Sequence, residues 1–460
     1  MSAPIFAVVG RVNRGKSSIV STLAADESVA IAAAPGTTRH NREYPLRVGD
    51  EVVYTLVDTP GFERPRHVLA WLVEHQTQTA DRRRVVERFV REHADSGQYA
   101  QECELLRPIL AGAAILYVVD GSVPFNPAYE AETEVLRWTG QPRMALINPI
   151  GPGDHTAEWR AVLDQYFSLV RVFDAHAADF AARMELLRAL RELVDPWRGA
   201  LDRAIALLEQ DRALRVRESA GLIADAIVDL LTLRDEQRLA VDEDPAPHRD
   251  GLAERYYARL REREQRLRRD LRRVFFHERL RVLQGDIDRA DEDLFATSTW
   301  SRLGLSRTQL MATGVASGAL IGGGIDLATG MASVFLGALI GSSVGLVSTL
   351  VAWSRLADVR VLGAPLGGRL LCIGPVRSPN FGWIALDRAW IFYEAVSKHA
   401  HARREPVELA GRAGRTQSLD AATRQRIGGC FDRLRRRSAD PAEIERARSE
   451  LAGLLEPLLP

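Results

Sequence analysis

Cysteine is scarce in this sequence, and motifs for a bound transition metal are missing. The three cysteines, Cys103, Cys372 and Cys430, lie far apart and form no CxxC pair. The ten histidines are scattered, and none lies in an HExxH motif. These absences disfavour a disulfide framework and a zinc site, and they favour the cytosol as the compartment.

An excess of charge of either sign is also absent. The 61 basic residues balance the 61 acidic ones, so net charge gives no reason to expect a polyanion as partner of the whole molecule. The first residues, "MSAPIFAVVG", lack a basic segment, so we expect no signal peptide. A chain of 460 residues predicts two to four domains.

The first informative motif is "FAVVGRVNRGKSSIV", in which GxxxxGKS follows a strand-like run and precedes a helix-like one. Glycines in such a loop let backbone N–H groups point at phosphate oxygens, the lysine reaches the β and γ phosphates, and the serine hydroxyl ligates Mg²⁺. The segment therefore predicts a nucleotide phosphate site. Its residues are Gly10, Asn13, Arg14, Gly15, Lys16, Ser17 and Ser18.

Two further segments fit the same site. "VVYTLVDTPGF" places Asp58 at the end of a strand-like run, where a carboxylate associated with Mg²⁺ belongs, and Gly61 can offer its backbone N–H to a γ-phosphate. Between the two motifs, "APGTTRHN" supplies Thr37 and Thr38, which we expect to close over the metal. The order and spacing of the three segments support one another.

These motifs resemble the Era-like branch of the translation-factor-related GTPases, on "GRVNRGKS", "PGTTRH" and "DTPG". The resemblance covers about residues 1–195 and implies an α/β domain with a mostly parallel six-stranded sheet that binds GTP or GDP with Mg²⁺. It implies Lys16, Thr38 and Gly61 as catalytic residues, and Ser17, Thr38 and Asp58 as residues of the metal site.

Phe62 stands where Ras-type enzymes place a glutamine that orients water, so we expect slow or partner-stimulated hydrolysis. In Era-like relatives with an apolar residue there, a P-loop asparagine can help to hold K⁺, and the matching residue is Asn13. The alternative is that Asn13 only braces the loop. Residues 63–110 contain apolar side chains at helical spacing and predict a helical insertion, either surface decoration or a sensor of the nucleotide state.

The base-recognition loop departs from the family pattern. "ALINPIG" has Asn148 in the expected place, but Pro149 replaces the usual lysine and Gly151 the usual aspartate. Loss of that carboxylate should weaken guanine discrimination. The residues assigned to base recognition are Asn148, Asp154 as a substitute carboxylate, and Ala175 and His176 in the following loop.

After residue 195 the pattern predicts long charged helices (196–300), a glycine-rich hydrophobic helical hairpin (301–355) and a small α+β domain with a helical tail (356–460). Glycines recur every fourth residue in the hairpin, and Trp300 and Trp353 flank it, which favours membrane contact through 309–352 over a soluble hairpin. This order resembles a bacterial family in which a GTPase domain precedes domain of unknown function 3482.

We interpret the chain as a GTPase that acts as a nucleotide-controlled switch or remodelling protein, cytoplasmic and at the inner face of a bacterial membrane. The expected partners are a guanine nucleotide, the membrane, and an unidentified protein or second copy of the chain. Nucleic acid is not expected, because no RNA-binding module is recognisable. The alternatives are an Era-like ribosome-assembly factor and a pseudo-GTPase scaffold without turnover.

Overall fold

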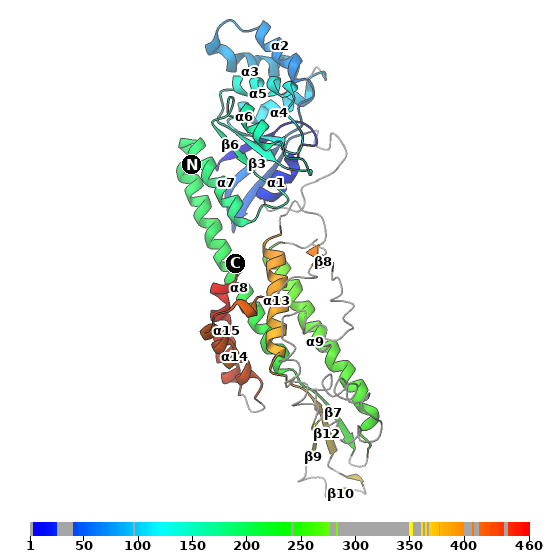
Figure 1. Ribbon diagram of the computed structural model, residues 1–460. Helices are drawn as coiled ribbons and strands as arrows, with labels where there is room; N and C mark the ends of the chain where they lie inside the picture. The colour runs from blue at the N-terminus through cyan, green and yellow to red at the C-terminus, as the bar shows by residue number, and fades with distance from the viewer. Residues whose placement is uncertain are drawn as a thin grey trace. The chain divides into compact units, whose positions relative to one another are not determined.

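The chain divides into two compact units, Met1–Ala213 with Lys398–Glu405, and Leu214–Ser397 with Pro406–Pro460 (Figure 1). The computed structural model describes residues 3–24, 40–94, 97–240, 243–276, 282–283, 349–352, 360–361, 364–365, 368–376, 378–399, 407–408, 414–436 and 440–460.

The first unit is built on a six-stranded sheet with the order β2-β3-β1-β4-β5-β6. All neighbouring strands run parallel except the antiparallel pair β2 and β3. The predicted α/β class and mostly parallel sheet are therefore confirmed. The strands are β1 (Ile5–Val9), β2 (Arg42–Val48), β3 (Glu51–Asp58), β4 (Ala114–Asp120), β5 (Arg143–Asn148) and β6 (Leu169–Val172).

Helices cover both faces of this sheet. Successive side chains of a strand point to opposite faces, so Phe6 and Val8 enter one hydrophobic cluster and Ala7 and Val9 enter another. Helices α1, α7 and the start of α8 (Arg198–Thr232) contribute to the first cluster, and α2 to α6 contribute to the second. The other helices are α1 (Lys16–Ala24), α2 (Pro65–Glu74), α3 (Arg82–His93), α4 (Ala100–Leu110), α5 (Glu130–Trp138), α6 (Thr156–Leu163) and α7 (Phe180–Leu193). Short 3₁₀ turns are η1 (Thr79–Asp81), η2 (Pro127–Tyr129) and η3 (Asp195–Trp197).

Three helices, α2 to α4, fill the stretch between β3 and β4 in which a helical insertion is predicted. Aromatic rings join the first two: Trp71 of α2 contacts Phe89 of α3 edge-on with 5.2 Å between ring centroids, and contacts His93 of α3 edge-on at 5.3 Å. Tyr99, just before α4, contacts Phe89 edge-on at 5.3 Å. The three helices therefore share one aromatic core and form a single packed layer.

The second unit begins within α8 and contains an antiparallel sheet with the order β7-β12-β9. Its strands are β7 (Asp235–Ala240), β9 (Thr349–Ala352) and β12 (Gly368–Ile373). The expectation of continuous helix through Asp235–Ala240 is wrong, because all six residues pair with β12 and the buried Leu239 faces the core. The partner strand lies too far along the chain for the local sequence to reveal the pairing.

The predicted glycine-rich hairpin lies mostly outside the described residues. Its last part is described, and there the helical prediction is wrong, because Thr349–Ala352 form β9 and pair with Arg369–Cys372. The main-chain hydrogen bonds offered by the free edge of β12 account for the strand. In the part of the chain that the structure describes, no helix is both long enough and apolar enough to span a membrane.

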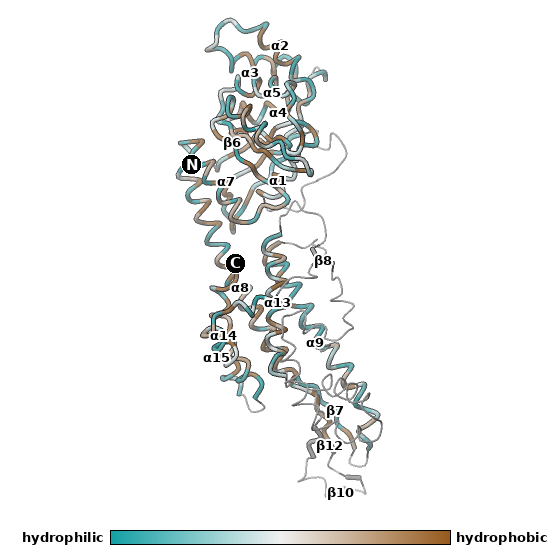
Figure 2. Tube along the Cα trace, viewed as in Figure 1, coloured by the Kyte–Doolittle hydropathy of each residue, from teal (hydrophilic) through white to brown (hydrophobic). Residues whose placement is uncertain are grey.

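Helices around this sheet share one hydrophobic cluster drawn from α8, α9, α13, α14 and α15. Along α9 (Ala246–Val274), buried Leu252, Tyr256 and Leu260 recur every fourth residue, and Figure 2 shows hydrophilic segments between hydrophobic ones along this helix. The predicted boundaries at residues 195, 300 and 355 stay a prediction. The remaining elements are α13 (Phe381–Ser397), α14 (Ala421–Leu434), α15 (Pro441–Leu455), η4 (Thr416–Ser418), η5 (Glu456–Leu458), β8 (Val282–Leu283), β10 (Arg360–Val361), β11 (Ala364–Pro365) and β13 (Val407–Glu408).

Candidate functional site

The predicted phosphate loop connects the end of β1 to the start of α1. Gly10 has φ +144°, and a Cβ there would lie 2.4 Å from the carbonyl oxygen of Val118. Gly15 has φ +80°, which also favours glycine. Between them, Asn13 adopts φ 59°, an uncommon value for a residue with a side chain. The local conformation therefore requires both glycines of the motif.

Lys16 lies at the first position of α1 and is buried. Its Nζ donates a hydrogen bond to the carbonyl oxygen of Arg11 at 2.9 Å, back across the loop. Burial lowers the pKa of Lys16 to about 8, while Asp58 and Glu132 act in the opposite direction. An anionic phosphate near this ammonium would restore its preference for the charged form.

Ser17 and Asp58 meet beside the loop, where the Ser17 Oγ donates to Asp58 Oδ2 at 3.0 Å. A hydroxyl and a buried carboxylate supply the hard oxygen ligands that Mg²⁺ prefers, so this pair fits the predicted metal site. Ser18 is buried in the first turn of α1. Thr37 and Thr38, assigned to close over the metal, lie outside the described residues.

The segment after Asp58 packs directly on the phosphate loop. A Cβ at Gly61 would lie 2.7 Å from the backbone nitrogen of Val12, so glycine is needed for this close approach. Phe62 is buried and forms an isolated parallel bridge with Arg11. A buried phenylalanine offers no polar group to a water molecule, and slow turnover stays a prediction.

The base-recognition residues are only partly brought together. Asn148 is fully buried, and its Oδ1 accepts a hydrogen bond from the backbone nitrogen of Ala175 at 3.1 Å. Its Nδ2 is buried without a hydrogen-bond partner and lies against Gly15. Thr22 of α1 donates to the carbonyl oxygen of Ala175 at 2.7 Å, which joins this loop to the phosphate site.

Asp154 and His176, by contrast, are exposed. Asp154 Oδ1 accepts from the backbone nitrogen of Thr156 at 3.0 Å at the start of α6, and this bond holds the pKa of Asp154 below its usual range. The backbone nitrogen of His176 donates to Asp174 Oδ1 at 2.8 Å. The structure thus gives Asp154 a local role beside α6, and its assignment to base recognition stays a prediction.

The comparisons with known proteins bear on both parts of the chain. A family model described as a domain of unknown function, DUF3482, matches residues 160–456, more than half of the chain. The chain belongs to the DUF3482 family. A second model, described as 50S ribosome-binding GTPase, matches residues 5–148. The N-terminal part of this DUF3482 protein is accordingly a GTPase domain of the Era and Der type, and the predicted resemblance is confirmed.

Curated relatives include GTPase Der of Vibrio campbellii, 26% identical over 42% of this chain and 33% of that protein. GTPase Der of Paraburkholderia phymatum is 31% identical over 32% of this chain and 26% of that protein. The DUF3482 protein thus spans a third or less of the length of these relatives. A solved structure of Era in complex with MgGDPNP and a segment of 16S ribosomal RNA has 14% identity and a TM-score of 0.31, covering 60% of this chain and 90% of that one.

Two ion pairs beside the phosphate loop were not foreseen from the sequence of this DUF3482 protein. Arg11 pairs with the fully buried Glu132, whose Oε2 also accepts from the Tyr117 hydroxyl at 2.9 Å. Arg14 pairs with Asp120 at 3.0 Å. Burial raises the pKa of Glu132, and Arg11 partly offsets this effect. The only local signal was the position of Glu132 on the buried face of α5.

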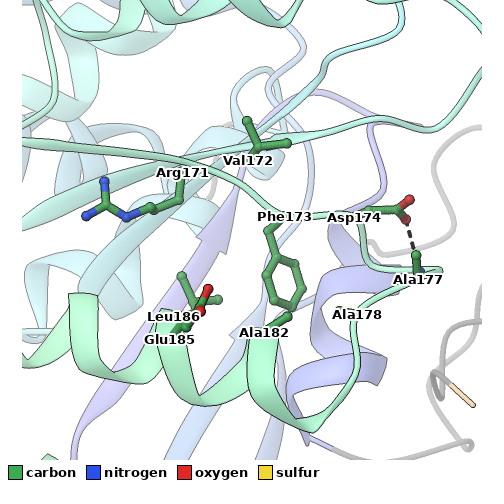
Figure 3. Close-up of a pocket in the computed structure, with 9 residues that line it drawn as sticks. All are labelled: Arg171, Val172, Phe173, Asp174, Ala177, Ala178, Ala182, Glu185 and Leu186. Atoms are coloured by element: carbon green, nitrogen blue, oxygen red, sulfur yellow. Dashed lines mark hydrogen bonds between the residues drawn. The ribbon is translucent and has the colours of Figure 1, made fainter. Parts of the chain in front are cut away.

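A separate depression of about 240 Å³ lies between β6 and α7 of the DUF3482 protein. In Figure 3 Phe173 lies in the middle, with Arg171 and Asp174 on opposite sides of it. No residue of the phosphate loop lines this depression, but Asp174 and Ala177 flank Ala175 and His176, the residues assigned to base recognition.

Proposed function

We propose that this protein binds GTP and GDP with Mg²⁺ and hydrolyses GTP slowly, as a nucleotide-controlled switch. The observation that carries the proposal is the convergence of Lys16, Ser17 and Asp58 at the carboxyl end of the parallel sheet. In α/β proteins ligands bind at this edge, and a phosphate loop before a helix is a preformed anion site. Mg²⁺ held by Ser17 and Asp58 would neutralise phosphate charge during hydrolysis.

The interior of the site supports a purine base, and the preference for guanine rests on the similarity to GTPases. The buried Nδ2 of Asn148 lacks a partner, and a buried polar group in this state favours a ligand that accepts its hydrogen bond. Gly151 supplies no carboxylate for the opposite edge of the base, so we expect ATP and ITP to bind more weakly than GTP but measurably.

Binding and hydrolysis of GTP by the purified full chain test this proposal. We expect Mg²⁺-dependent GTP binding that Lys16→Ala abolishes, because this buried ammonium lies at the phosphate loop and would pair with the β and γ phosphates. The sequence contains one other lysine, Lys398, and Lys398→Ala is the matched control that should bind normally. Wild-type protein that binds no guanine nucleotide, or a Lys16→Ala variant that binds as well as wild type, would contradict the proposal.

Two cellular partners are compatible with a GTPase of this kind. The description of the matched model as a 50S ribosome-binding GTPase favours a ribosomal particle, and the glycine-rich segment within 309–352 favours a membrane. We propose the membrane role first. Its support, the glycine-rich segment within 309–352, lies in this chain's own C-terminal part and outside the matched GTPase segment 5–148. Sedimentation of cell extracts distinguishes the two, because the protein should pellet with membrane vesicles and not with 50S particles.

A further inference from the structure

Helix α4 contacts the segments on both sides of the predicted nucleotide site. Glu102 of α4 is 1% exposed, and its Oε1 accepts hydrogen bonds from the backbone nitrogens of Glu63 at 3.0 Å and Arg64 at 2.6 Å. Gln101 reinforces the contact, since its Nε2 donates to Glu63 Oε1 at 2.6 Å. One buried carboxylate thus holds the backbone two and three residues after Gly61.

The same helix also holds the chain that follows Thr37 and Thr38. The backbone nitrogen of Asn41 donates to Glu104 Oε1 at 3.0 Å, and the Asn41 Nδ2 donates to the Glu104 carbonyl oxygen at 2.7 Å. Asn41 lies immediately before β2, whose first residue, Arg42, pairs with Asp58. Residues 102 and 104 of one helix therefore contact the backbone that follows Gly61 and the residue that precedes β2.

These contacts bear directly on the position of Gly61. Directly after Gly61, Phe62 is bridged to Arg11 of the phosphate loop. Downstream, Glu102 holds Glu63 and Arg64. The contacts of the three residues after Gly61 therefore hold Gly61 against Val12. At this place the N–H of Gly61 would meet a γ-phosphate. A hydrogen bond to a carboxylate is among the stronger ones in proteins, and a buried carboxylate that lost both donors would be left unpaired.

We propose that Glu102 is a positioning residue that sets Gly61 for contact with the γ-phosphate, and that α4 thereby couples the nucleotide state to the helices α2 and α3. This inference rests on the proposed GTP binding. Only GTP carries a γ-phosphate, so the loss of this positioning weakens GTP binding more than GDP binding. A carboxylate that only stabilised the fold would affect both nucleotides alike.

The test is calorimetric titration of the full-length chain with a non-hydrolysable GTP analogue and with GDP, in Mg²⁺. For Glu102→Ala we expect the affinity for the GTP analogue to fall about tenfold, equivalent to about 1.4 kcal/mol, while GDP affinity changes less than about threefold. Glu102→Gln keeps an oxygen acceptor at the same place and should recover most of the loss. Glu134→Ala is the matched control, because this half-buried carboxylate accepts hydrogen bonds from Arg137 and Trp138 of its own helix, α5, and touches neither Gly61 nor its neighbours among the described residues.

Amide hydrogen exchange of the wild-type chain supplies a second measurement in case Glu102→Ala does not fold. We expect peptides spanning 62–66 and 101–107 to exchange at rates that differ between the GTP-analogue and GDP complexes. Equal weakening of both nucleotides in Glu102→Ala, or exchange independent of the nucleotide, would overturn the inference. Wild-type protein that binds neither nucleotide would instead refute the proposed function itself, so nucleotide binding by the wild type distinguishes the two failures.

Discussion

Gly151→Asp restores the carboxylate that the base-recognition loop lacks. A Cβ at position 151 would lie 3.0 Å from the Ser122 Oγ and 3.3 Å from the Ser122 Cβ. Ser122 must therefore shift by a few tenths of an ångström, and its hydroxyl, which donates to Asp120 Oδ1, must adjust with it. Only a side chain has to move, so we expect the variant to fold.

The magnitude follows from the hydrogen bonds that the new carboxylate would accept. Guanine offers N1–H and a 2-amino group, whereas inosine lacks the amino group. One hydrogen bond to a charged acceptor is worth about 1.5–3 kcal/mol. The strain at Ser122 is common to both complexes and cancels in their ratio, so the preference for GTP over ITP should rise about tenfold or more.

The assay is titration of wild type, Gly151→Asp and Gly151→Asn with GTP and with ITP. The asparagine variant has nearly the same shape without the charge, and it should gain less discrimination than the aspartate variant. Thermal unfolding of each variant checks that the fold is retained. An unchanged ratio of GTP to ITP affinity in a folded Gly151→Asp protein would refute the idea that this loop faces the edge of guanine.

Three other outcomes are expected. Because burial lowers the pKa of Lys16 to about 8 and a bound triphosphate raises it, the Kd for GTP should be nearly constant below pH 8 and should increase between pH 8 and 9; a flat profile over that range would contradict the assigned role of Lys16. GTP hydrolysis should be faster in KCl than in NaCl at equal ionic strength, and Asn13→Ala should remove the difference while binding persists; identical rates in wild type would dismiss potassium. The full chain should float with liposomes, and deletion of 309–348, chosen to keep β9, should abolish flotation, whereas flotation by the deleted protein would rule out this segment as the contact.

Local motifs made part of the site predictable. Gly10, Gly15 and Lys16 are close together in the sequence, and the conformation of their loop depends mainly on glycine and on the neighbouring strand and helix. Asp58 was also found from sequence, because a strand that ends in DTPG is a short-range signal. In the structure Ser17 Oγ donates to Asp58 Oδ2, and the role of the two residues at a metal stays a prediction.

Contacts between distant residues were not predictable from one sequence. Glu102 and Glu132 look like ordinary charged residues of amphipathic helices, yet both are buried. Glu102 accepts from the backbone of the loop after β3, and Glu132 pairs with Arg11 in the loop after β1. Strand β7 was missed for a similar reason. Its polar sequence forms a strand because β12, far along the chain, supplies the main-chain partners.

The pairing of β7 with β12 also has a consequence for the order in which the chain can fold during synthesis. The sheet of the first unit is complete once Val172 has left the ribosome. The second sheet must wait for Ile373, because Asp235 and Ile373 are paired in its register. Closing a long loop costs conformational entropy before the contacts are gained, and such non-local pairing is slow. The GTPase domain can therefore acquire its nucleotide while β7 still lacks a partner. Until β12 is synthesised, the unpaired edge of β7 stays exposed to chaperones and to association with other chains.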